Sequence, residues 1–248
     1  MASPAFVISE GRGPVIATAI HAGHELRDEA QQAMVLDEAV RLREEDPFTD
    51  RIAAIAPTHI VVNRSRFEVD LNRPRESAVY MRPADAWGLD VWREPPSPAL
   101  IAGSLAIYDE FYAELDRLIR AKVAAHSVAI VLDIHSYNHR RDRAPADPTT
   151  NPEINLGTRT APRSWMPLIE RFSLDLAKAG PFDVRENVKF GGGAMAAWIH
   201  RTFPVTAVAL AIELKKTFMD EWTGELDAAH LSRLAHGISM TLPALEDR

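Results

Sequence analysis

The chain has 248 residues, of which 46% are hydrophobic and 25% are charged, and its formal net charge at pH 7 is −7. This composition is typical of a soluble globular protein, and the negative charge disfavours nucleic acid as a partner because phosphate binding usually requires a basic surface. The absence of cysteine excludes disulfides, cysteine nucleophiles and thiolate ligands, so any metal must be bound by histidine or carboxylate side chains.

The first predicted strand covers residues 15–20, a short apolar run rich in β-branched side chains. It ends at His21, and Glu25 follows four residues later. A helix is predicted from residue 28 to residue 43, with acidic side chains in its first turn and apolar residues at helical spacing. Residues 59–62 predict a second strand.

Prolines are frequent in residues 74–103, which predicts a long surface loop. The next helix is predicted over residues 105–126, with Ser104 as its N-cap. It leads into residues 128–134, an apolar run typical of a strand that is buried on both faces of a parallel sheet. This strand is predicted to end at His135.

Residues 137–163 are polar, basic and marked by prolines, which predicts a second long loop over the carboxyl ends of the strands. A helix is predicted over residues 165–178. Residues 205–212 form another fully apolar run, which predicts a buried strand that ends at Glu213. A terminal helix is predicted from residue 225 to about residue 242.

Three predicted strands thus end in His21, His135 and Glu213, and Glu25 lies one turn beyond the first. Ligands of open α/β sheets bind beyond the carboxyl ends of the strands. Two histidines and one carboxylate are the usual zinc ligands of amide hydrolases, with one position left for water. Glu213 is suited to act as general base because partial burial would raise its pKa, and a salt bridge to one of the two lysines that follow it is the alternative.

Six segments of the chain are Ile20–Glu25 (IHAGHE), Phe67–Pro74 (FEVDLNRP), Leu132–Ser136 (LDIHS), Asn155–Thr158 (NLGT), Phe190–Gly193 (FGGG) and Ile212–Met219 (IELKKTFM). These segments resemble motifs of the N-formylglutamate amidohydrolase family, which is related to the aspartoacylase and zinc carboxypeptidase group. They occur in unchanged order between about residues 15 and 221, although Ile20 stands where proline is usual in the family. The resemblance implies a single domain over residues 1–248 with a zinc-dependent exopeptidase-like α/β fold, in which a central mixed, largely parallel sheet is flanked by helices.

The resemblance also implies one zinc ion per chain, bound by His21, Glu25 and His135. The wider group spaces the first histidine and the carboxylate by three residues, whereas Glu25 lies four residues after His21. His24 and Asp50 are therefore alternatives to Glu25 as the third ligand.

Further roles follow from the same resemblance. Arg66 would polarise the scissile carbonyl, and Asn72 and Arg73 would bind a carboxylate of the substrate. The chemistry of Arg73 agrees, because a planar guanidinium binds a carboxylate through two parallel charge-assisted hydrogen bonds. Glu213 would act as general base and then as general acid.

The predicted function is hydrolysis of the amide bond of an N-acyl amino acid such as N-formylglutamate, by water that the metal activates. A zinc carboxypeptidase-like peptidase and a non-catalytic small-molecule binding protein on the same fold are the alternatives. The expected partner is a small molecule, and the oligomeric state stays open. Because no segment reaches about 18 consecutive apolar residues and the N-terminus lacks a signal-peptide pattern, we expect a cytoplasmic protein without membrane contact.

Overall fold

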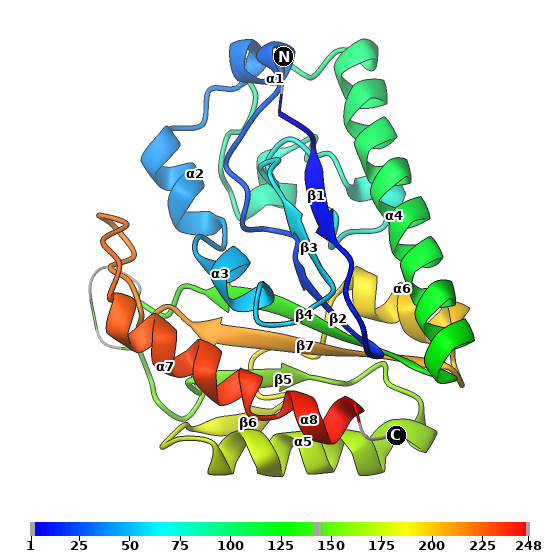
Figure 1. The fold of residues 1–248 in the computed structure, drawn as a ribbon. Helices are drawn as coiled ribbons and strands as arrows, with labels where there is room; N and C mark the ends of the chain where they lie inside the picture. The colour runs from blue at the N-terminus through cyan, green and yellow to red at the C-terminus, as the bar shows by residue number, and fades with distance from the viewer. Residues whose placement is uncertain (1–2, 141–143, 145, 247–248) are drawn as a thin grey trace.

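A single mixed sheet runs through the middle of the molecule (Figure 1). The structure is a computed structural model that describes residues 3–140, 144 and 146–246. Within these residues the strand order is β1-β3-β2-β4-β7-β5-β6. The strands are β1 (Phe6–Ser9), β2 (Val15–Ala19), β3 (His59–Val62), β4 (Ala129–Tyr137), β5 (Ile154–Gly157), β6 (Val184–Glu186) and β7 (Ala207–Lys215).

The four central strands β3, β2, β4 and β7 are parallel, which confirms the largely parallel sheet. The edges supply the antiparallel pairs, since β1 is antiparallel to β3 and β5 is antiparallel to β7. β6 then pairs in parallel with β5. The carboxyl ends of β2 and β4, which carry the two predicted histidine ligands, therefore meet at the same edge of the sheet.

Helices cover both faces of the sheet and bury its apolar side chains. The helices are α1 (Asp28–Ala33), α2 (Glu38–Glu44), α3 (Thr49–Ala53), α4 (Pro98–His126), α5 (Met166–Lys178), α6 (Ala194–Thr202), α7 (Ala228–Ser239) and α8 (Leu242–Glu246). One hydrophobic cluster packs α4 and α6 on the sheet, and a second packs α3, α5, α7 and α8 on the other face. Figure 1 shows helices on both sides of the sheet. Among the described residues, none of the helices combines the length and the apolar character that crossing a membrane requires.

The strands β4 and β7 are the longest of the sheet, and they pair along nine residues each. Every residue of β4 is buried. Both strands continue past the predicted ends at residues 134 and 212, so His135 and Glu213 lie within the ladder and directly opposite each other. In β4 the polar side chains beyond the apolar run, His135 and Ser136, find a polar partner in Asp46.

Two predicted helix boundaries were wrong. The helix predicted over residues 28–43 is divided into α1 and α2, because the backbone around Met34 pairs with the segment around Trp92. The long helix α4 begins at Pro98, inside the predicted loop, and Ser97 caps it by accepting a hydrogen bond from the N–H of Leu100 at 3.1 Å. Ser104 lies inside α4 and accepts a hydrogen bond from an arginine instead.

Short elements account for most of the remaining differences. The strands β1, β5 and β6 and the helix α6 were not predicted, and β5 lies within the predicted loop of residues 137–163. Residues 141–143 and 145 of that loop lie outside the described residues. The predicted helix of residues 165–178 is confirmed as α5, whereas the terminal helix is two helices, α7 and α8. Strands of three or four residues are recognised locally only when they are apolar runs, as in β3.

Candidate active site

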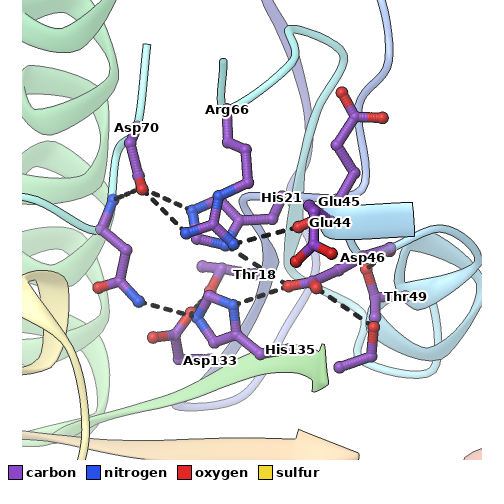
Figure 2. Close-up of polar contacts among 12 residues, drawn as sticks. Thr18, His21, Glu44, Glu45, Asp46, Thr49, Arg66, Asp70, Asp133 and His135 are labelled. Carbon is purple, nitrogen blue, oxygen red and sulfur yellow. Dashed lines mark hydrogen bonds and ion pairs between the residues drawn. The ribbon is translucent and has the colours of Figure 1, made fainter. Parts of the chain in front are cut away.

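Three side chains from distant parts of the chain meet at the carboxyl end of the sheet (Figure 2). His21 follows β2, His135 lies in β4, and Asp46 lies between α2 and α3. Each of the three residues is 2% exposed. The structure therefore brings the two predicted histidine ligands together inside the protein.

The spacing of these side chains fits a tetrahedral metal ion. Nδ1 of His135 lies 3.1 Å and Nδ1 of His21 lies 3.4 Å from the same oxygen, Oδ2 of Asp46. Zinc bonds of about 2.0–2.1 Å at tetrahedral angles place neighbouring ligand atoms about 3.3 Å apart. Nδ1 of His21 is buried and has no hydrogen-bond partner within the described part of the chain. A buried nitrogen without a hydrogen-bond partner is free to serve as a metal ligand.

The other nitrogen of each imidazole faces a buried carboxylate. Nε2 of His21 lies 2.8 Å from Oδ1 of Asp70, and Nε2 of His135 lies 3.0 Å from Oδ1 of Asp133. Thr18 donates a further hydrogen bond of 3.0 Å to the same oxygen of Asp133. Carboxylates in this position fix the tautomer and orientation of metal-binding histidines, and they leave both Nδ1 atoms directed at Asp46. The donor set thus fits a divalent ion of the zinc type.

Glu25, the predicted carboxylate ligand, lies outside this cluster. Its side chain is 47% exposed and accepts a hydrogen bond of 2.9 Å from Nη1 of Arg64. The N–H of Glu25 donates to the carbonyl of Asn63, and this pairing draws the residue toward the end of β3. Asp46 takes the place beside the histidines, because its own N–H donates a hydrogen bond of 2.9 Å to the carbonyl of His21.

The two alternatives to Glu25 also have other positions. Nδ1 of His24 lies 2.5 Å from Oε2 of Glu45, and this hydrogen bond is the main cause of a raised pKa for His24. Asp50 lies in the first turn of α3 and is partly exposed. The sequence contained one signal for Asp46, its place in an acidic run just before Pro47, but that pattern is equally typical of a solvated loop.

Asp70 is the buried centre around which the predicted substrate-binding residues gather. Burial alone would raise its pKa, but the Arg66 guanidinium and His21 hold the pKa well below its usual range. The carboxylate of Asp70 is therefore an anion at the base of the site. Its contacts are His21 Nε2 at 2.8 Å, the Asn72 N–H at 2.9 Å, Arg66 Nη2 at 2.9 Å, Arg73 Nε at 3.7 Å, and the hydroxyl of Tyr80.

Asn72 connects this centre to the cluster of His21, Asp46 and His135. Its Nδ2 lies 3.3 Å from Nε2 of His135, and its Oδ1 accepts a hydrogen bond of 3.1 Å from the N–H of Met195 at the start of α6. A Cβ on Gly193 would come within 2.2 Å of Asn72 Oδ1. The absence of a side chain at Gly193, the last glycine of the Phe190–Gly193 segment, thus allows the side chain of Asn72 to lie directly against the backbone.

The two arginines of the predicted site differ in exposure. The side chain of Arg66 is 14% exposed, and its guanidinium lies 4.9 Å from the ring centre of Trp87. The side chain of Arg73 is 36% exposed, and its Nη2 donates to the carbonyl of Asp85 at 3.1 Å. Arg66 is therefore largely committed to Asp70, whereas Arg73 keeps more of its surface open to solvent.

Glu213 lies beside the cluster on the neighbouring strand, opposite His135 in the parallel ladder and opposite Asn155 of β5 on its other side. Burial raises the pKa of Glu213 to about 7, and the negative charges of Asp46 and Asp133 add to this effect while the histidines oppose it. A carboxyl group with a pKa near neutrality can both take and return a proton.

The two lysines that follow Glu213 bind elsewhere. Nζ of Lys215 donates to the carbonyl of Asn151 at 3.0 Å. Nζ of Lys216 donates to the carbonyls of Arg43 and Glu45, each at 2.6 Å. These contacts disfavour the alternative in which Glu213 serves only as a salt-bridge partner.

The chain matches one family model and several solved structures. The family model described as N-formylglutamate amidohydrolase matches residues 13–219. The fold is similar to that of an N-formylglutamate amidohydrolase from Ralstonia eutropha JMP134, with 18% identity, 97% coverage of each chain and a TM-score of 0.77. It is also similar to a gene product from Agrobacterium tumefaciens, with 18% identity, 99% coverage of this chain, 97% coverage of the other and a TM-score of 0.69. A search of curated proteins found no match.

We expect Asp70→Asn to lower the free energy of unfolding by about 3–5 kcal/mol at neutral pH, because the change leaves a buried guanidinium without its counter-charge. Urea unfolding followed by circular dichroism measures this. Because the pKa of Asp70 is lowered in the folded protein, its carboxylate stabilises the fold above the usual carboxyl pKa of about 4, and this stabilisation is lost as the pH falls below that value. The difference in the free energy of unfolding between the parent and Asp70→Asn should therefore narrow in acid.

Asp109→Asn is the control, because Asp109 pairs with Arg75 at the surface and should matter far less. Equal losses in the two variants would contradict the role of Asp70 as the buried centre.

Proposed function

Because this chain belongs to the N-formylglutamate amidohydrolase family, we propose that it hydrolyses the amide bond of a small N-acyl amino acid such as N-formylglutamate, with one zinc ion bound by His21, Asp46 and His135. The observation that carries the proposal is the convergence of both Nδ1 atoms on one carboxylate oxygen, with Glu213 on the adjacent strand. Zinc held there would supply Lewis acidity, which polarises a carbonyl group and acidifies water.

In the proposed reaction Glu213 takes a proton from the attacking water and passes it to the amide nitrogen. Water oxygen bonds to the acyl carbon, the carbon–nitrogen bond breaks, and the products are the free amino acid and the small carboxylic acid. The raised pKa of Glu213, about 7, supports this role because proton transfer is most efficient when the catalytic pKa is close to the working pH.

Arg66 is the candidate to stabilise the oxygen of the scissile carbonyl. Its Nη2 is bound to Asp70, but the contact of its Nη1 with the carbonyl of Glu44 is long, at 3.5 Å. This second N–H can exchange a weak contact for the developing negative charge on the substrate. Asp70 binds both Arg66 and His21. The same carboxylate therefore orients the guanidinium proposed to polarise the carbonyl and one of the proposed metal ligands.

Arg73 is the candidate for the substrate carboxylate, since it is more exposed than Arg66 and a guanidinium suits bidentate carboxylate binding. Asn72 directly precedes Arg73 in the sequence, and its side chain lies next to His135. Its amide group can supply a further N–H donor to the substrate. The acidic amino-acid part of the substrate would then lie on the Arg73 side, and its acyl group would face Glu213.

We expect elemental analysis of the purified protein to find close to one zinc ion per chain. Asp46→Asn and His135→Ala should lose it, because the first replaces a charged carboxylate ligand by a weakly binding neutral amide and the second removes an imidazole ligand. Glu25→Gln is the matched control and should retain zinc, since the Glu25 carboxylate pairs with Arg64 outside the cluster. Loss of zinc in Glu25→Gln together with retention in Asp46→Asn would reverse the assignment of the third ligand.

We expect Glu213→Gln to keep the parent's zinc content but to lower turnover of N-formylglutamate by roughly 10²-fold to 10⁴-fold, the usual contribution of a positioned general acid-base group. The base must be deprotonated to act, so kcat/KM of the parent should fall as the pH falls through the pKa of Glu213, and this acidic limb should shift or vanish in the variant.

Steady-state kinetics between pH 5 and 9 measure both effects. A variant as fast as the parent would remove Glu213 from the mechanism. A parent that binds N-acyl amino acids without hydrolysing them would favour the binding protein over the enzyme.

We expect Arg73→Lys to raise KM for N-formylglutamate, because lysine cannot reproduce the two parallel hydrogen bonds of a guanidinium. The effect should be smaller for an analogue in which the carboxylates are amides. Arg82→Lys serves as the control, since the Arg82 side chain is 76% exposed and bound to Asp85. The same rise in KM for both substrates would argue that Arg73 acts on the fold rather than on the carboxylate.

A further inference from the structure

Lys216 is a buried cation next to the candidate metal site. The residue is 1% exposed and follows directly after β7. Its Nζ donates three hydrogen bonds, to the carbonyl of Arg43 at 2.6 Å, the carbonyl of Glu45 at 2.6 Å and Oδ1 of Asn138 at 3.0 Å. All three protons of the ammonium group are therefore used.

Each partner of Lys216 lies close in sequence to a residue of the site. The carbonyl of Glu45 belongs to the peptide group that leads into Asp46. Asn138 lies three residues after His135, and Lys216 itself lies three residues after Glu213. One ammonium group thus ties the segment between α2 and α3 to the carboxyl ends of β4 and β7.

The backbone of Lys216 is fixed as well. Its N–H donates to the carbonyl of Tyr137 at 3.1 Å, which prolongs the ladder between β4 and β7 by one more hydrogen bond. The backbone that carries the ammonium group is therefore held by the sheet. Residues 43–46, in contrast, lie at the end of a seven-residue helix, α2, and are not part of the sheet. Contacts from Lys216 to two carbonyls of that segment restrain it from the side of the sheet.

Burying an ammonium group is unfavourable unless polar partners replace its water. Lys216 is bound to two backbone carbonyls and one amide oxygen. The negative charges of Asp46, Glu44 and Glu221 attract it from nearby. Asp46 reaches the histidines through its side chain and donates its N–H to the carbonyl of His21, so a displacement of the Glu45 carbonyl would move the proposed ligand.

We propose that Lys216 is the positioning residue that holds the Asp46 segment against β4 and β7 and thereby sets the affinity of the site for zinc. The inference rests on the proposed function, because it takes His21, Asp46 and His135 as the ligands. It adds a residue that touches neither metal nor substrate. The geometry of a metal site depends on such outer contacts, whose loss weakens metal binding by about 10-fold to 100-fold.

The test compares Lys216→Met with Lys122→Met in full-length protein freed of metal. Lys122 is also buried, at 8% exposed, and its Nζ donates to the carbonyl of Gly11 at 2.6 Å, away from the cluster. Competition with a chromophoric chelator gives the zinc dissociation constant of each protein, and thermal unfolding without metal gives its stability. Both variants should unfold at a lower temperature than the parent, but only Lys216→Met should bind zinc about 10-fold to 100-fold more weakly.

Zinc affinity in Lys216→Met equal to that of the parent would overturn the inference, and so would an equal loss of affinity in Lys122→Met. If Lys216→Met does not fold, Asn138→Ala takes its place, since it removes one of the three partners and keeps the lysine. That variant should bind zinc more weakly than the parent, and unchanged affinity would again overturn the proposal. A parent that binds no zinc would instead refute the metal site of the proposed function.

Discussion

The site depends on the ion pair and hydrogen bonds of one buried carboxylate, that of Asp70. It is fully buried, yet it stays ionised because Arg66 and His21 compensate its charge. Through His21 it orients one proposed ligand, through Arg66 it holds the group proposed to polarise the substrate, and through the N–H of Asn72 it aligns the segment that leads to Arg73. A buried charge is costly, so this arrangement is stable only when all of its partners are in place.

The site combines a rigid part and a restrained part. His135 and Glu213 lie opposite each other in the nine-residue pairing of β4 with β7, so the sheet itself fixes the distance between a proposed ligand and the proposed base. Asp46 comes from the connection between two short helices and has no strand to hold it. Hydrogen bonds from its N–H to His21 and from Lys216 to Glu45 hold this connection against the sheet. The sheet thus fixes the positions of His135 and Glu213, and hydrogen bonds fix that of Asp46, the third proposed ligand.

Much of the fold could be predicted from local patterns. The buried strands β2, β3, β4 and β7 are apolar runs of strand length, and α5 has clear helical periodicity. The division of residues 28–43 into two helices could not be predicted, because it follows from backbone pairing between Met34 and Trp92. The strands β1, β5 and β6, which lie outside the central block of parallel strands, have three or four residues each and form because neighbouring strands offer free hydrogen-bonding edges.

The sequence by itself determined that two histidines and one glutamate lie near the carboxyl ends of apolar strands, because apolar runs mark the strands and the common direction of parallel strands brings their carboxyl ends together. His21, His135 and Glu213 were therefore recognisable without a structure. Only the tertiary structure decided that the carboxylate beside the histidines is Asp46 and that Glu25 faces Arg64. Carboxylates in polar connecting segments look alike in sequence, and which of them turns inward depends on contacts between residues far apart in the chain.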